Sequence, residues 1–148
     1  MPKSRACYRD LHNYKYVLAQ DYVHPQPVSI KNHNVRIRRF IDLKPDGRLT
    51  VKKGYAWDGA SGPAIDTPSI MRGSLVHDAL YQLMRMKKLD HKKHRKPADK
   101  LFRKMCLADR MSTLRAGYVY QSVRWFGLGA AKPPETTGPN KNAIICSP

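Results

Sequence analysis

Two stretches of this chain carry apolar side chains at helical spacing, and they limit what it can fold into. Residues 97–106 place Leu101, Phe102, Met105 and Cys106 on one face of a helix. Residues 73–84 show the same period over a longer apolar stripe, which consists of Leu75, Val76, Ala79, Leu80, Leu83 and Met84. Such stripes are stable only when buried, so the sequence predicts two packed helices at the centre of the fold.

Sequence signals near these stripes predict where the two helices begin. The first is expected to begin at Gly73-Ser74, because the Ser74 hydroxyl can cap the free N–H groups of a first turn. The second is expected to begin near Pro97, since proline suits the first helical position. Asp99 would then lie in the first turn, where the exposed N–H groups favour a carboxylate.

Three polar residues of these helices are candidates for shared chemistry. His77 and Tyr81 are one turn apart on the same face of the first helix, whereas Asp78 points about 100° away. If the helices pack antiparallel, Asp99 can reach a ring nitrogen of His77. That contact would fix the imidazole tautomer and raise its basicity. A buried His77–Asp99 pair that only holds two helices together is the structural alternative.

The segment 58–63, D-G-A-S-G-P, is a candidate cation site. Gly59 and Gly62 allow the backbone to turn tightly and present its carbonyl oxygens. Carbonyl oxygens with a neighbouring carboxylate are the ligands that calcium prefers, and Asp58 or Asp78 can supply the carboxylate. The alternative is a plain turn before the first helix.

The order of the motifs resembles an uncharacterised protein family. D-G-A-S-G-P at 58–63, H-D-A-L-Y at 77–81, A-D-K-L-F at 98–102 and V-R-W-F-G at 123–127 follow the pattern of a bacteriophage and prophage family, the domain-of-unknown-function family numbered 1353. This resemblance covers most of the chain and implies a phage protein without an established activity.

A second, local resemblance covers only residues 59–102. The glycine-rich loop, the H-D-x-x-Y helix and the later A-D-x-x-F helix are similar to the calcium-dependent phospholipase A fold of secreted enzymes and parvovirus capsid proteins. It implies His77 as general base, Tyr81 and Asp99 as the groups that orient it, and Asp78 with the 59–62 carbonyls as calcium ligands. This chain lacks the cysteines that flank the histidine in the secreted enzymes.

Charge is the most unusual bulk property. The 148 residues include 28 Lys and Arg against 11 Asp and Glu, a formal net charge of +17, while a hydrophobic content of 41% supports a folded chain. Such an excess favours nucleic acid, anionic lipid or an acidic protein partner. The densest basic run is the candidate acidic-partner site, represented by Lys87, Lys88, Lys92, Lys93, Arg95 and Lys96. A solvated basic connector is the alternative, and no apolar run is long enough to predict a transmembrane helix.

The remaining patterns predict an α+β domain at 13–130, between a basic N-terminal arm at 1–12 and an extended tail at 131–148. Residues 14–22, 35–43 and 48–53 read as three strands of a small antiparallel sheet, with P-D-G at 45–47 as a hairpin turn. Residues 113–126 read as a third helix, capped by Ser112 or Thr113. Its expected core positions are Leu114, Tyr118, Val119, Ser122 and Phe126.

The leading functional expectation is a structural or accessory bacteriophage virion protein, at the tail or the head-tail junction. It would bind other virion proteins through its basic surface and termini, and would occur in the virion and, during assembly, in the host cytoplasm. The first alternative is a calcium-dependent, phospholipase A-like hydrolase with His77, Asp99 and Tyr81 as the catalytic group. The second is nucleic-acid binding, which rests on charge alone.

Overall fold

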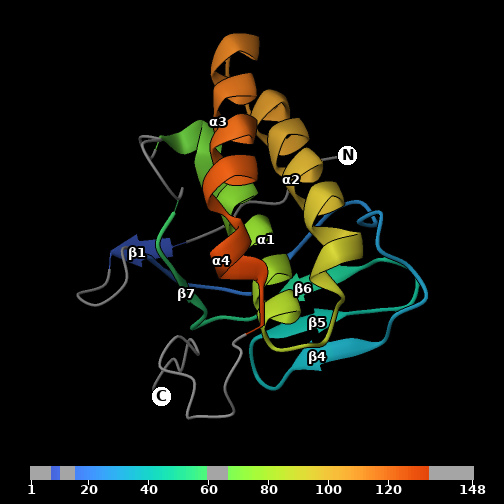
Figure 1. Ribbon diagram of the computed structural model, residues 1–148. Helices are drawn as coiled ribbons and strands as arrows, with labels where there is room; N and C mark the ends of the chain where they lie inside the picture. The colour runs from blue at the N-terminus through green and yellow to red at the C-terminus, as the bar shows by residue number, and fades with distance from the viewer. Residues whose placement is uncertain (1–7, 11–15, 60–66, 134–148) are drawn as a thin grey trace.

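The architecture joins two antiparallel sheets to a group of helices, so the α+β prediction is confirmed (Figure 1). The computed structural model describes residues 8–10, 16–59 and 67–133. Strands and helices contribute to one hydrophobic core, in which Trp57 and Tyr22 from the sheets and Leu80 and Phe102 from the helices are buried.

The described strands form two sheets in place of the single three-stranded sheet that was predicted. The first sheet has the order β1-β2-β7, and the second has the order β3-β6-β5-β4, with antiparallel pairing throughout. The strands are β1 (Tyr8–Asp10), β2 (Tyr16–Leu18), β3 (Tyr22–Val23), β4 (Val35–Ile37), β5 (Ile41–Leu43), β6 (Leu49–Val51) and β7 (Ala56–Trp57).

Two of the predicted strands are each divided by a bend or turn. The predicted strand 14–22 bends after Leu18, so that β2 and β3 join different sheets. The predicted strand 35–43 folds into the β4–β5 hairpin, which turns at Arg39 with a φ of 73°. A straight strand would have placed the Arg39 cation in a row of apolar side chains, whereas the hairpin pairs Ile37 with Ile41.

Other sequence expectations for the first half of the chain have mixed outcomes. The P-D-G turn at 45–47 is confirmed, because Gly47 has a φ of +89° and Leu43 pairs with Leu49 across it. Residues 8–10 of the expected N-terminal arm instead form β1, which pairs with β2. The rest of that arm and residues 134–148 of the expected tail lie outside the described residues.

Both central helices begin earlier than predicted. The first, α1 (Pro68–Arg85), follows Thr67 and has proline in its first turn, so Ser74 lies inside the helix. Its hydroxyl donates to the Met71 carbonyl at 2.9 Å and accepts from the Trp57 indole at 3.1 Å. The second, α2 (His91–Ala108), is capped by the Asp90 carboxylate, which accepts from the Lys92 N–H at 2.9 Å.

The early start of α2 changes the setting of Asp99. Pro97 is inside this helix, and Asp99 is in its middle, far from the unpaired N–H groups of the first turn. The prediction of a helix dipole acting on Asp99 is therefore wrong. Its ionisation has to be explained by the side chains around it.

The third helix, α3 (Thr113–Phe126), has the predicted bounds and is capped by Ser112. Its predicted core is only partly right, because Val119 and Ser122 are buried, whereas Leu114, Tyr118 and Phe126 are exposed. A short helix, α4 (Leu128–Ala131), follows it and was not predicted. No helix in the described part of the chain combines the length and apolar character that crossing a membrane requires.

Candidate functional site

The candidate site lies where α1, α2 and α3 meet, with α1 the innermost of the three helices (Figure 1). Contacts between α1 and α2 run in opposite directions along the two helices. Arg95 contacts Tyr81, Asp99 contacts His77, and Phe102 lies over Gly73. The two helices therefore pack antiparallel, which is the condition under which the sequence analysis expected Asp99 to reach His77, and this packing brings the predicted catalytic residues together.

Asp99 is the centre of the site and is fully buried. One carboxylate oxygen, Oδ1, lies 2.7 Å from Nε2 of His77 and accepts from the Tyr81 hydroxyl at 2.5 Å. The other, Oδ2, accepts from Nη1 of Arg124 at 2.7 Å. Burial alone would raise the pKa of Asp99, but the bonds from His77, Tyr81 and Arg124 outweigh burial and lower it. Asp99 is therefore an ionised carboxylate.

Arg95 supports the same cluster from behind Tyr81. Its Nε donates to the Tyr81 hydroxyl at 3.2 Å, and its Nη2 donates to the carbonyls of Val123 and Arg124 at 2.8 and 2.6 Å. Arg95 is consequently buried, and its assignment to the acidic-partner surface is wrong. Its charge is used at the last turn of α3, where the Val123 carbonyl also accepts from the Gly127 N–H and a cation is favoured by the helix dipole.

His77 packs against two aromatic rings. Its ring centroid is 4.0 Å from that of Tyr81 and 4.8 Å from that of Phe102, and the side chain is 5% exposed. Burial lowers the pKa of His77, but the neighbouring carboxylates of Asp78 and Asp99 outweigh burial, so that the pKa is raised. With Nε2 bound to Asp99, the second nitrogen, Nδ1, lies 3.7 Å from Oδ1 of Asp78.

Asp78, Asp58 and Gly59 are the described part of the predicted metal site. Burial raises the pKa of Asp78, and the negative charge of Asp58 raises it further. Carboxylate oxygens are ligands of the kind that calcium takes, so the chemistry of both side chains is compatible with the predicted site. Gly59 is described, with a φ of 75°, whereas Gly62 lies outside the described residues. Within the described ranges no three His, Cys, Asp or Glu side chains group around a common metal position, so most ligands would be backbone carbonyls or water.

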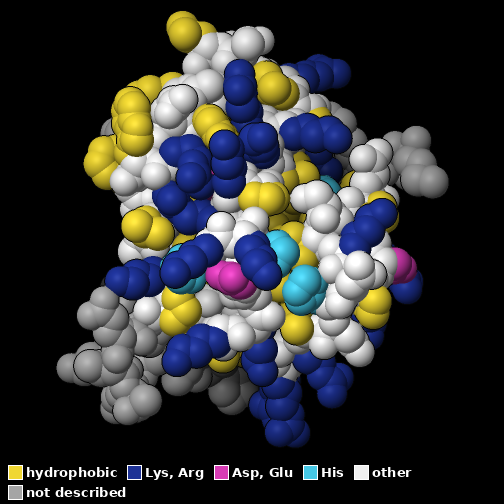
Figure 2. All heavy atoms as spheres, turned by 45° about the vertical axis from the view of Figure 1, so that its right-hand side comes forward, with side chains coloured by type: hydrophobic (Ala, Val, Ile, Leu, Met, Phe, Trp, Pro, Cys, Tyr) yellow, Lys and Arg dark blue, Asp and Glu magenta, His cyan; other side chains and the backbone are white. Residues whose placement is uncertain are grey.

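The remaining residues of the predicted acidic-partner surface are exposed. They are Lys87, Lys88, Lys92, Lys93 and Lys96. Figure 2 brings the α2 side of the molecule forward and shows Lys and Arg side chains gathered over this face. On α2 the exposed cations recur at helical spacing through Lys100 and Lys104, while the one acidic residue of the helix, Asp99, is buried.

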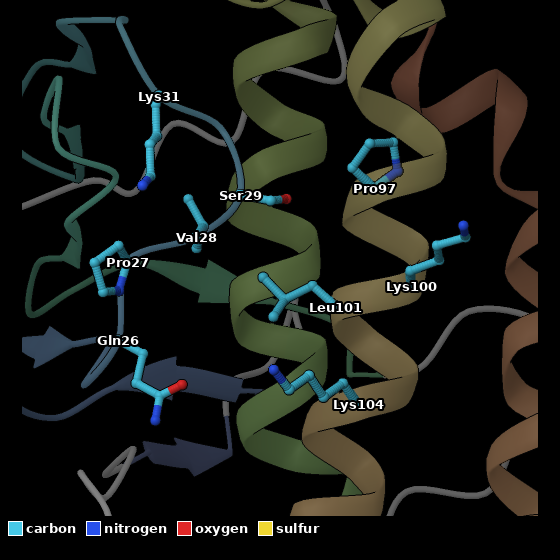
Figure 3. A pocket seen from close by; sticks show the side chains of 9 residues that line it. All are labelled: Gln26, Pro27, Val28, Ser29, Lys31, Pro97, Lys100, Leu101 and Lys104. Atoms are coloured by element: carbon cyan, nitrogen blue, oxygen red, sulfur yellow. The ribbon is translucent and has the colours of Figure 1, made fainter.

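A groove beside α2 was not predicted from the sequence. It has a volume of about 720 Å³ and lies between α2 and residues 26–31. Leu101 and Lys104 reach from α2 toward that segment, and Lys31 approaches from the opposite side (Figure 3). Pro27, Val28 and Pro97 add apolar walls, and Gln26, Ser29 and Lys100 complete the lining. The groove is separate from the cluster around Asp99, none of whose members lines it.

Sequence reasoning missed the places of Arg95 and Arg124 in this cluster. Arg95 is four residues before Asp99 and so lies on the same face of α2, but inside a run of cations it carried no distinguishing signal. Arg124 lies in α3, and only the packing of α3 against α2 shows which carboxylate it meets.

Residues 38–123 match the family model described as protein of unknown function (DUF1353). The matched region covers more than half of the 148 residues and includes Asp58, His77, Tyr81 and Asp99. No curated protein and no solved structure matches the chain.

Proposed function

Because the chain belongs to the DUF1353 family, whose function is unknown, we propose an activity from the site itself, namely ester hydrolysis with His77 as general base. One observation carries this proposal. Asp99 engages Nε2 of His77 at 2.7 Å and so directs the lone pair of a neutral imidazole to Nδ1. The second nitrogen, Nδ1, lies 3.7 Å from Oδ1 of Asp78, the residue that we propose below as a calcium ligand.

The proposed reaction uses the chain's own groups for proton transfer. Neutral His77 keeps its proton on Nε2, and this N–H donates a hydrogen bond to Asp99. The other nitrogen, Nδ1, takes a proton from a water molecule as that water attacks the ester carbonyl. The imidazolium then returns the proton to the departing alkoxide, which leaves as the alcohol. Asp99 remains ionised throughout, since Arg124 neutralises its second oxygen, and Tyr81 keeps the carboxylate in place.

Calcium is the cofactor that we propose for this site, with Asp78 and Asp58 as its protein carboxylates. When bound, a calcium ion would supply positive charge to the developing oxyanion. The raised pKa of Asp78, caused by burial and by the charge of Asp58, supports this assignment. The substrate class that we propose, a phospholipid ester, follows from the local resemblance to phospholipase A.

The experiment is hydrolysis of mixed anionic and zwitterionic phospholipid vesicles by the purified protein, with calcium or with a chelator. We expect fatty acid release that falls by about 10²–10⁴ in His77→Gln, the usual contribution of a general base. The matched control is His33→Gln, because His33 is partly exposed and its Nδ1 bonds only to the Lys31 carbonyl. Equal rates in His77→Gln and wild type would rule out the proposal, as would no hydrolysis of any ester by a folded wild-type protein.

A role as a structural or accessory virion protein is a second proposal, compatible with the first. The exposed lysines of α2 and of the link before it support docking to an acidic virion protein or to nucleic acid. We place the protein in the virion, at the tail or head-tail junction, and in the host cytoplasm during assembly. Quantitative mass spectrometry of purified particles tests this, since a virion component occurs at a fixed copy number and a contaminant does not.

A further inference from the structure

The surface of α3 is unlike that of a helix whose exposed face is polar. Several of its large apolar residues do not face the core, and together with Leu128 of α4 they form an exposed apolar set, which we call the α3 ridge. The ridge consists of Leu114, Tyr118, Trp125, Phe126 and Leu128, which are 88%, 49%, 70%, 66% and 49% exposed. Large apolar side chains exposed together in this way mark an interaction site.

The geometry of the helix places the main part of the ridge on one line. At about 100° per residue, Tyr118 and Trp125 lie within about 40° of Leu114 around the helix axis. The inward face of the same helix is formed by Ala116, Val119, Ser122 and Val123. Leu114, Tyr118 and Trp125 thus form a second apolar face turned away from these inward residues, and Phe126 and Leu128 are exposed near the C-terminal end of the helix.

The charge around the ridge indicates what it binds. Between His91 and Lys132 there are only two acidic residues, and both are neutralised by arginines. Arg124 binds Asp99, and Arg72 holds Asp109 through two bonds of 3.0 and 2.9 Å. Neither of these two carboxylates is therefore left to offset the exposed cations of this region, and the described acidic residue next to it, Asp90, caps the first turn of α2. Figure 2 shows hydrophobic side chains along one edge of the face that carries the crowded Lys and Arg side chains.

We propose that the α3 ridge inserts into the interface of an anionic phospholipid membrane while the surrounding cations contact the lipid headgroups. Tryptophan and tyrosine are favoured where one end of a side chain meets hydrocarbon and the other meets water. Leucine and phenylalanine gain free energy by entering the acyl region, and basic residues add attraction to anionic headgroups. This binding mode does not depend on the chemistry at His77, so it stands apart from the proposed hydrolysis.

Lipid fits the ridge better than the other anionic occupant, single-stranded nucleic acid. Bases would stack on Tyr118, Trp125 and Phe126, but they would leave Leu114, the most exposed ridge residue, without a role. The ridge is also a convex helix face, whereas single strands are bound in grooves.

The experiment uses Trp125 as its own reporter. The chain has two tryptophans, and Trp57 is buried, 1% exposed, with its indole bonded to Ser74. We expect the emission of the full-length protein to shift to the blue with vesicles of phosphatidylcholine and phosphatidylglycerol, and spin-labelled lipid to quench it. Phosphatidylcholine vesicles alone should produce less than about a tenth of this binding, because the headgroup attraction is absent.

A pair of double variants separates insertion from charge. Leu114→Ser with Phe126→Ser keeps Trp125 and every cation, and should weaken binding to the anionic vesicles by roughly tenfold or more, because two apolar side chains no longer leave water. The control, Val23→Ser with Met86→Ser, alters two exposed apolar residues outside the ridge and should bind as wild type does. Circular dichroism verifies that both variants fold.

Four outcomes would overturn the proposal. Equal binding by both double variants would mean that charge alone attracts the membrane. A blue shift that grows with protein concentration in the absence of lipid would mean that a second copy covers the ridge. If an oligonucleotide quenched the Trp125 emission and the protein did not bind vesicles, the ridge would be assigned to nucleic acid. Absence of binding to anionic vesicles by folded wild-type protein would exclude a membrane directly.

Discussion

Asp99 accepts hydrogen bonds from side chains of two other helices. His77 and Tyr81 reach it from α1, and Arg124 reaches it from α3, while Asp99 itself belongs to α2. A buried carboxylate is destabilising without such partners, and here each partner also fixes the position of a helix. The residues that orient the His77 imidazole are therefore the same ones that hold the helices together.

Replacing this carboxylate should lower stability most in a middle range of pH. Asp99→Asn keeps the shape but removes the charge that Arg124 and His77 face, so we expect the free energy of unfolding to fall by about 3–5 kcal/mol in that range. The pKa of Asp99 is lowered on folding, so the stability that its ionised carboxylate contributes is complete above about pH 4 and is lost at lower pH. The pKa of His77 is raised on folding, so the stability that its protonated imidazole contributes is complete below about pH 6.5 and is lost at higher pH.

Urea unfolding of wild type and Asp99→Asn across this pH range measures the difference directly. The gap in unfolding free energy should be largest between about pH 4 and pH 6.5 and should narrow on both sides. A gap that stays constant from acid to alkaline pH would mean that neither ionisation is linked to folding.

Tyr81 allows a more limited test of the same cluster. Tyr81→Phe removes one donor to Asp99 and one acceptor for Arg95, and should lower the free energy of unfolding by about 1–3 kcal/mol. Tyr118→Phe is the matched control, since that side chain is 49% exposed, and its effect should stay within about 0.5 kcal/mol. Comparable losses in the two variants, measured by chemical denaturation, would count against a stabilising role for the Tyr81 hydroxyl.

At the scale of elements, α1 and α2 approach closely because Gly73 has no side chain. A Cβ atom there would lie 2.9 Å from Cδ2 of Phe102 and 3.4 Å from Sγ of Cys106. The ring of Phe102 also stacks on His77, so it cannot move aside without disturbing the candidate site. The close contact between these helices is therefore part of what positions the imidazole.

Two glycine substitutions in helices should have opposite signs. Gly73→Ala forces the Phe102 ring to move, and should destabilise the protein by about 1–3 kcal/mol despite the better helix propensity of alanine. Gly117→Ala, in α3, places its Cβ no nearer than 4.0 Å to Arg103, and should stabilise it by about 0.5–1 kcal/mol. Thermal unfolding of both variants is sufficient, and a gain in stability from Gly73→Ala would contradict the close approach.

The sequence predicted elements well where local signals were strong. The pattern at 113–126 gave the bounds of α3, and the spacing of His77, Tyr81 and Asp99 predicted their meeting, because helical geometry and antiparallel packing determine it. Local signals misplaced the starts of α1 and α2, because Ser74 and Pro97 are both residues that suit a helix start. The actual first turn of α1 begins at Pro68, and the actual N-cap of α2 is Asp90. Exposure of Leu114 depends on which side of α3 meets α2, and periodicity alone does not decide that.

At the scale of the whole molecule, the net charge of +17 opposes folding through repulsion among exposed cations. Bringing the ionic strength from about 0.02 M to about 0.3 M shortens the screening length several-fold, so the midpoint of thermal unfolding should rise. An equal osmolality of sucrose serves as the control that does not screen charge. A midpoint that falls with added salt would show that attractive ion pairs outweigh the repulsion.

The arrangement of the two sheets is also a property of the whole molecule, and the sequence did not predict it. Strands of two or three residues, such as β3 and β7, carry too few side chains to show a period. Their pairing is decided by partners that are distant in the chain, as when Tyr22 pairs with Val51. The general class could be predicted, but the division into two sheets could not.

The central claim is that His77 is an available base whose proton is held on Nε2, and nitrogen NMR of its imidazole measures this without any substrate. Comparison with His77→Gln assigns the signals among the six histidines. Above its raised pKa, His77 should lose its proton from Nδ1 and keep the one on Nε2, and added calcium should shift the Nδ1 signal through the adjacent Asp78. An imidazole that stays doubly protonated until the protein unfolds, or whose Nδ1 ignores calcium, would instead make His77 a permanent ion pair that joins α1 to α2.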